Sequence, residues 1–112
     1  MTIICVNGPE IGSLCNITGN LTISATSSSV RLIGLTINGN IIHSGACNLY
    51  IQNLNCNGNF TKSSNSYLSI NNMICSNTSV ISISGSGNCN IINGCNLGLS
   101  FTINNSGAIV VI

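Results

Sequence analysis

Apolar and polar residues alternate in short runs along the middle of the chain, and three of these runs can be aligned with one another. The runs begin at Val30, Leu49 and Leu68, so the start moves by the same step each time (49 − 30 and 68 − 49). A fixed period of about 20 residues is typical of a solenoid, in which each repeat is one turn of backbone stacked on the next. Alternation with a period of two residues indicates strands. The pattern therefore predicts a parallel β-solenoid.

Five columns of related residues emerge when the three runs are aligned. Four columns are apolar, and one holds residues that favour tight turns. We predict about five coils of roughly 19–21 residues, each with three short strands, in a single domain over residues 1–112. A β-sandwich or jelly roll is the alternative, in which the repeat would be coincidental alternation. The columns are Val30, Leu49 and Leu68; Leu32, Ile51 and Ile70; Gly34, Asn53 and Asn72; Leu35, Leu54 and Met73; and Ile37, Cys56 and Cys75.

The repeat unit from Leu49 to Asn59, Leu-x-Ile-x-Asn-Leu-x-Cys-x-Gly-Asn, resembles the coils of right-handed parallel β-helix proteins of the pectate-lyase-like superfamily. In that fold, stacked asparagines often occupy a tight turn between two strands. Asparagine and glycine suit this turn because they tolerate a left-handed backbone. The resemblance covers roughly residues 20–103 and implies a fold without implying a function. The positions that match the turn ladder are Gly34, Asn53, Asn72 and Asn93.

Charged side chains make up only 3 % of the sequence, and the net charge is +1. Many enzymes with the resembled fold use clustered carboxylates for hydrolysis or for binding calcium, but Glu10 is the only acidic residue here. Arg31 and Lys62 are too few to form a nucleic-acid-binding footprint. No run of about 20 apolar residues predicts a membrane span. We therefore expect no enzymatic activity, no cofactor, no nucleic-acid partner and no small-molecule substrate.

His43 and Lys62 are one period apart (62 − 43 = 19), so they belong to one column. Because both side chains are polar, we expect this column to face outward. A Cys-His nucleophile would require a cysteine near His43, and surface polarity is the simpler interpretation.

Seven cysteines are the most unusual feature of the composition. Cys56 and Cys75 share an apolar column with Ile37 and are expected to be buried thiols. Proximity suggests candidate disulfides, with buried reduced thiols as the alternative, and sequence alone does not fix the connectivity. There is no Cys-x-x-Cys pair to favour a zinc site. The pairs considered are Cys5 with Cys15, Cys89 with Cys95, and Cys47 with Cys56.

Both ends of the sequence are strand-like, apolar and uncharged, and they lack the lysine, proline or covering helix that usually protects an edge strand. We expect each end to present unpaired backbone groups to another copy of the chain. Pairing of the two terminal strands within one molecule, or continuation in a longer solenoid, are the alternatives. The residues expected at the assembly ends are Ile3, Ile4, Val6, Ile109, Val110, Val111 and Ile112.

These features favour a structural subunit whose partners are copies of itself, polymerising head-to-tail into an extracellular or particle-surface filament. The first residues lack the basic region and the long apolar core of a signal peptide. An ice-binding or glycan-binding solenoid is the alternative. The outward columns of this chain mix threonine, asparagine and isoleucine, and the aromatic residues form no obvious stacking platform. Those aromatic residues are Tyr50, Phe60, Tyr67 and Phe101.

Overall fold

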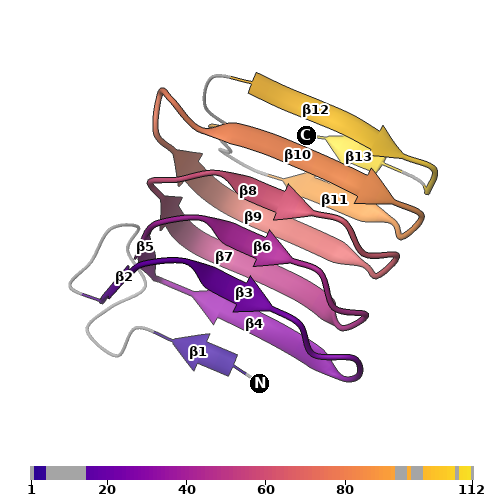
Figure 1. Ribbon diagram of the computed structural model, residues 1–112, viewed down its shortest axis with the longest axis horizontal. Helices are drawn as coiled ribbons and strands as arrows, with labels where there is room; N and C mark the ends of the chain where they lie inside the picture. Colours follow the sequence, from indigo (N-terminus) through magenta and orange to yellow (C-terminus); the bar gives the residue numbers. More distant parts are fainter. Residues whose placement is uncertain (1, 5–14, 93–95, 97–99, 108, 112) are drawn as a thin grey trace.

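A computed structural model shows an all-β chain whose parallel strands stack as a β-solenoid of about four turns (Figure 1). The structure describes residues 2–4, 15–92, 96, 100–107 and 109–111. Every strand pair recorded among them is parallel, whereas a sandwich or jelly roll is built from antiparallel strands. The solenoid prediction is therefore confirmed, and the sandwich alternative is wrong.

Two sheets face each other, and the chain passes from one to the other and back in every turn. Sheet A contains, in spatial order, β1 (Thr2–Ile4), β4 (Ser29–Ile33), β7 (Asn48–Cys56), β9 (Leu68–Cys75), β11 (Cys89–Ile92) and β13 (Ile109–Val111), with β2 (Asn16–Thr18) and β5 (Thr36–Asn38) beside this path. Sheet B contains β3 (Leu21–Ile23), β6 (Ile41–His43), β8 (Phe60–Lys62), β10 (Val80–Gly85) and β12 (Ser100–Asn105).

The strand register reproduces the sequence period. Leu49 pairs with Leu68, Leu68 with Cys89, and Cys89 with Ile109, so each step is roughly 19–21 residues, as a solenoid requires. The prediction of about five coils differs slightly from the about four turns that the structure shows. Five strands in sheet B are separated by four turns.

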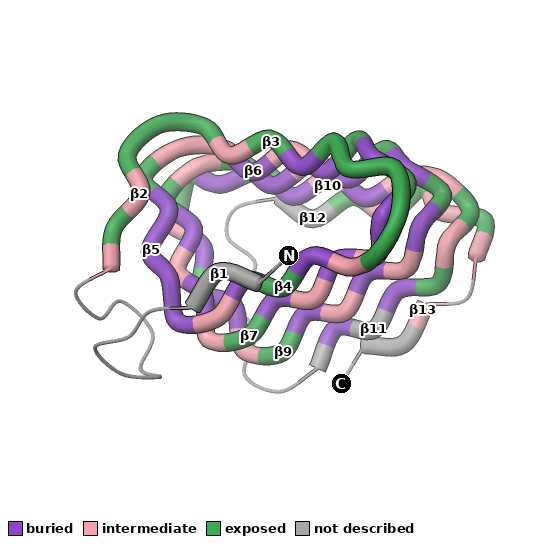
Figure 2. The backbone as a smooth tube through the Cα atoms, turned by 90° about the horizontal axis from the view of Figure 1, so that it is seen from below, coloured by how far each residue is buried: buried purple, intermediate pink, exposed green. Residues whose placement is uncertain are grey.

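The core lies between the two sheets, and buried positions alternate with exposed ones along the strands (Figure 2). Leu49, Leu68 and Ile70 are completely buried, with the same column positions in adjacent turns directly above and below them. Burying a side chain of this size contributes about 1.5–3 kcal/mol. Each turn therefore stabilises its neighbours through stacked apolar columns.

Asparagine and glycine shape two of the corners of the solenoid. At the first corner Gly34, Asn53 and Asn72 have positive φ values of 72°, 51° and 66°, and Asn72 Nδ2 donates a hydrogen bond of 2.9 Å to Asn53 Oδ1. Asn93, the fourth predicted member of this turn ladder, lies outside the described residues. At a second corner the side chain of Asn40 accepts a 2.9 Å hydrogen bond from the backbone N–H of Asn59 in the next turn.

Candidate functional site

The two ends of the chain lie at opposite ends of the stack (Figure 1). In sheet A the terminal strands are β1 and β13, and in sheet B they are β3 and β12. Among the described strands, each of these four pairs on only one side. The alternative in which the terminal strands pair with each other is therefore wrong. Of the predicted assembly residues, Ile3, Ile4 and Ile109–Val111 lie on these end strands, while Val6 and Ile112 lie outside the described residues.

The N-terminal end of the stack contains a cavity of about 310 Å³ between β3 and β4. Leu21, at its rim, is only half-buried, whereas Ile41 and Phe60 in the next turns of the same column are fully buried. Among the described residues, side chains of this column are therefore less buried at the first turn than in the turns that follow. Its lining residues are Leu21, Thr22, Ile23, Ser24, Ala25, Val30 and Leu32.

The C-terminal end shows the same incomplete burial. Ile103 and Ile109 are half-buried, although Ile83 and Cys89, their register partners one turn earlier, are only 1 % exposed. Apolar side chains of the last turn are thus left partly in contact with solvent, as they are at the first turn.

His43 and Lys62 are fully buried, so their predicted place on the surface is wrong. They do share one column, but that column faces the core and runs from Ile23 through His43 and Lys62 to Ile83. The prediction failed because it judged the two residues by their polarity. The two-residue period of a strand places His43 on the same side as Ile41, and Lys62 on the same side as Phe60.

Backbone carbonyl groups solvate the Lys62 ammonium inside the core. Lys62 Nζ donates hydrogen bonds of 2.8 Å to the carbonyl oxygen of Ser64 and 3.3 Å to that of Ser84. Burial lowers the pKa of Lys62, and the nearby Cys89 thiol opposes this shift by favouring the charged amine. Lys62 is therefore held by the loop that follows β8 and by the end of β10 in the next turn.

His43 belongs to the same polar cluster, which comprises His43, Cys47, Lys62, Ser64 and Ser66. His43 Nε2 lies 2.8 Å from the carbonyl oxygen of Cys47, 3.3 Å from Ser66 Oγ and 3.8 Å from Cys47 Sγ. A carbonyl oxygen only accepts hydrogen bonds, so Nε2 carries the proton. Nδ1 is buried and has no partner among the described residues. In this geometry His43 Nε2 does not provide a base for the Cys47 thiol.

The stability of the protein should depend on pH through His43. Burial lowers the pKa of His43, and Lys62 adds to this effect, while the hydrogen bond to Cys47 opposes it. Below pH about 6.5 the unfolded chain therefore takes up a proton that the folded chain does not, which favours unfolding. We expect the free energy of unfolding to fall between pH about 7 and 5, by at most about 1.4 kcal/mol per pH unit.

Urea unfolding at several pH values would measure this slope. His43→Gln should remove it, because His43 is the only histidine in the sequence and glutamine does not titrate. A slope that persists unchanged in His43→Gln would contradict the assignment.

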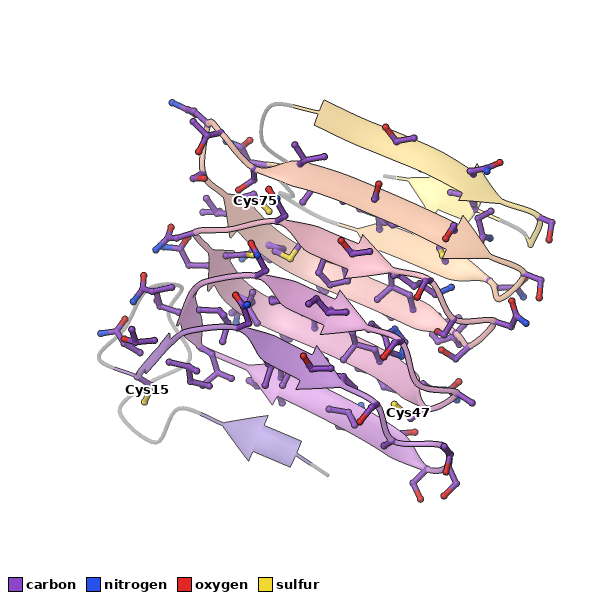
Figure 3. The ribbon with its side chains drawn as sticks, in the orientation of Figure 1. Cys15, Cys47 and Cys75 are labelled. Carbon is purple, nitrogen blue, oxygen red and sulfur yellow. The ribbon has the colours of Figure 1, made fainter. Side chains whose placement is uncertain are left out.

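The described cysteines are mainly buried thiols. Cys47, Cys56 and Cys89 are free thiols, so the suggested pairings of Cys47 with Cys56 and of Cys89 with Cys95 are wrong. Cys15 is disulfide-bonded, and Cys5 and Cys95 lie outside the described residues. The disulfides were expected from proximity in sequence. In the fold, Cys47 lies on the opposite side of the solenoid from Cys75, which is the register partner of Cys56 (Figure 3).

Cys56 and Cys75 are register partners in adjacent turns, as their shared column predicted. A hydrogen bond between the two side chains lowers the pKa of Cys56 to about 7; burial opposes this shift, and a hydrogen bond to Gly58 assists it. This acidic thiol lies inside the core, so it is shielded from reagents in solution.

The structure brings three residues together on the outer side of sheet A that the sequence analysis had not grouped. The Tyr50 and Tyr67 rings lie 5.7 Å apart between centroids, and the Arg31 guanidinium carbon lies 4.4 Å from the Tyr50 ring centroid. The sequence period could have placed Arg31 beside Tyr50, because the two residues are one repeat apart (50 − 31 = 19). They are register partners in the fold.

No family model matches the chain, and comparisons with curated proteins and with solved structures found no match. Within the described part of the chain, no helix is long and apolar enough to cross a membrane. The same residues contain no group of three or more His, Cys, Asp or Glu side chains placed to hold a metal ion. The fold class of the chain is therefore assigned from the strand register alone.

Proposed function

We propose that the protein is a structural subunit that polymerises head-to-tail, with the last turn of one copy stacked on the first turn of the next. The observation that carries this proposal is that, among the described strands, β1, β13, β3 and β12 each pair on one side only. A head-to-tail contact joins two different surfaces of the same chain. Such a contact forms a ring when the rotation between copies closes, and an open filament when it does not.

One column of sheet B illustrates how the first turn of one copy would match the last turn of another. In sheet B one column runs through Leu21, Ile41, Phe60, Ile81 and Phe101, all apolar, from the first turn to the last. If β3 of a second copy pairs with β12, its Leu21 continues the column that ends at Phe101. The joint would then repeat the packing found between turns inside one molecule.

The composition and the cysteines support a filament outside the cell or on a particle surface. A net charge of +1 and 3 % charged residues leave little electrostatic repulsion between copies. The disulfide at Cys15 fits an oxidising environment. We also propose, from the turn ladder at Gly34, Asn53 and Asn72, that the solenoid is the right-handed pectate-lyase-like kind.

A cysteine pair across the expected joint tests the proposal. Thr22 on β3 and Thr102 on β12 are both exposed and lie in one outward column, four strand spacings apart, or about 19 Å. They are too far apart for a disulfide within one molecule but would be neighbours across a joint. We expect Thr22→Cys/Thr102→Cys to form a ladder of covalent oligomers on a non-reducing gel after mild oxidation.

The matched control is Thr61→Cys/Thr102→Cys. These two positions share the same column but are two strand spacings apart within a molecule and are not neighbours across the joint. This control should give no more oligomer than the unmodified protein. Absence of the ladder from Thr22→Cys/Thr102→Cys at high protein concentration would reject head-to-tail assembly.

A glycan-binding module is the second candidate, and one observation favours it. Arg31, Tyr50 and Tyr67 form a contiguous aromatic and cationic surface on sheet A, and such rings offer an apolar face beside hydrogen-bonding groups. A binding screen with neutral and acidic oligosaccharides would test this candidate independently of assembly.

A further inference from the structure

Among the described residues, the outer face of sheet A carries one charged side chain, the guanidinium of Arg31. Arg31 is exposed on β4, whereas Lys62, the other basic residue of the sequence, is buried in the core. Glu10 is the only acidic residue of the sequence and lies outside the described residues. Within the described part of the chain, the Arg31 charge therefore has no carboxylate side chain to pair with.

The Tyr50 ring holds this guanidinium in place. The guanidinium carbon of Arg31 lies 4.4 Å from the centroid of the Tyr50 ring, and the two residues are register partners on β4 and β7. A guanidinium over an aromatic face gains a cation–π attraction while the N–H donors along its edge can still point toward a ligand. Those donors form a rigid fork that matches the two oxygens of one carboxylate. The stacked Arg31 is therefore preorganised for a single carboxylate.

Tyr67 extends this surface beyond Tyr50. The two ring centroids are 5.7 Å apart, with the ring planes inclined by 46°. The backbone N–H of Tyr67 donates a 3.2 Å hydrogen bond to Asn48 Oδ1 of the preceding turn, and both tyrosines are half-buried. A tyrosine ring offers an apolar face beside a hydroxyl group, which suits the C–H face and the hydroxyl groups of a sugar ring. We call Arg31, Tyr50 and Tyr67 together the aromatic–cationic surface.

Neutral polar side chains surround the aromatic–cationic surface. Ser69 is the register partner of Tyr50, and Gln52 and Asn71 are register partners in the neighbouring outward column. Gln52 and Asn71 are exposed, and Ser69 is half-buried. Amides and hydroxyl groups supply both donors and acceptors without adding charge. These surroundings fit a ligand that is rich in hydroxyl groups and poor in charge.

We propose that the aromatic–cationic surface binds a neutral oligosaccharide that carries one carboxylate, with the carboxylate on Arg31 and the adjoining sugar rings on Tyr50 and Tyr67. This inference rests on the glycan-binding candidate given above and specifies its ligand. A chain of acidic sugars fits less well, because one cation leaves all of its carboxylates but one without a partner. The single positive charge thus favours a ligand with a single acidic group.

Other partners match this surface less well. A second copy of the chain brings no carboxylate side chain among its described residues, and one exposed cation is too few for a nucleic acid. A peptide that binds by adding a strand needs an unpaired sheet edge, whereas β4 and β7 each pair on both sides.

An oligosaccharide array tests the proposal. Each neutral oligosaccharide is printed uncapped, capped by one sialic or uronic acid, and capped by the methyl ester of that acid, which keeps the size and removes the charge. Oligogalacturonate and glutamate-containing peptides complete the array. We expect the singly acidic forms to bind about ten- to a hundredfold more tightly than their esters, the usual effect of a hydrogen bond to a charged group.

Variants of the surface assign the contacts, with titration calorimetry of the tightest singly acidic oligosaccharide and its ester. Arg31→Gln should weaken binding of the acid by about ten- to a hundredfold and leave binding of the ester unchanged. Arg31→Lys keeps the charge without the fork and should restore only part of the loss. Tyr50→Leu should weaken both ligands. Thr61→Ala, on the outer side of sheet B, is the control and should weaken neither. Equal losses for acid and ester in Arg31→Gln would overturn the proposal.

This proposal and the glycan-binding candidate fail in different ways. If no oligosaccharide binds, or if only the acidic peptides bind, glycan binding itself is rejected. If the uncapped forms or oligogalacturonate bind as tightly as the singly acidic forms, glycan binding stands and the pairing of Arg31 with one carboxylate is rejected.

Discussion

Gly58→Ala is expected to destabilise the solenoid by about 4 kcal/mol or more, which is at the extreme of single-substitution effects. A Cβ atom at Gly58 would collide with the carbonyl group of Gly39 in the preceding turn and would lie 2.7 Å from Asn40 Oδ1. The backbone at Gly58 does not have the positive φ that favours glycine, so this cost is steric. It arises because adjacent turns approach more closely at this corner than a side chain allows.

Gly19→Ala is the control for Gly58→Ala. Gly19 occupies the same corner at the first turn, where a Cβ would meet no atom within 4 Å, although its φ of 106° is unfavourable for alanine. We expect it to cost only about 1–2 kcal/mol of backbone strain. Urea unfolding followed by circular dichroism measures both. Equal losses for the two variants would show that contact between turns is not the cause.

Leu49→Ala is expected to cost about 2–5 kcal/mol, the usual range for emptying a buried leucine site. Leu49 is fully buried and lies between Val30 and Leu68 of the adjacent turns. Its removal would leave a cavity bounded above and below by other side chains, which cannot easily collapse. Thermal and urea unfolding of the variant would measure the loss.

Gln52→Ala provides the comparison for Leu49→Ala. Gln52 lies on the same strand, β7, but its side chain is exposed, and surface substitutions usually change stability by less than about 0.5 kcal/mol. A loss as large as that of Leu49→Ala would mean that the two faces of the strand are assigned incorrectly.

The fold could be predicted from the sequence because two periods coincide. A period of two residues shows which side chains of a strand face the core. A period near 19 shows that Leu49 stacks on Leu68, so the same pattern predicts both the strands and their register. Asparagine and glycine marked the corner at Asn53 and Asn72 because few other residues tolerate its left-handed backbone.

The inner polar cluster was not predicted, because the polarity of His43 and Lys62 was given more weight than the two-residue period of their strands. His43 and Lys62 obey the two-residue alternation, and the fold places them inside where backbone carbonyl groups of the loops satisfy their donors. Folding alone brings those carbonyl groups together, and no pattern of side chains in the sequence predicts their positions. Proximity in sequence likewise suggested disulfides for Cys47 and Cys89, which are free thiols in the fold.

The candidate assembly ends were predicted from the apolar composition of the terminal segments, whereas the proposed joint required the register. The apolar terminal segments did not show which strand of a second copy would pair with which end. The register of sheet B supplies that information for the proposal, because it shows that Leu21 of the first turn and Phe101 of the last turn belong to one column.

The axial rise per subunit in the assembled filament, measured by electron cryomicroscopy, tests the central claim most directly. If each copy stacks on the next, its five levels in sheet B and six in sheet A, at about 4.8 Å each, predict a rise of about 24–29 Å. A rise well outside this range would contradict a joint between the last turn of one copy and the first turn of the next. Only single, monodisperse subunits at the highest soluble concentration would contradict head-to-tail stacking altogether.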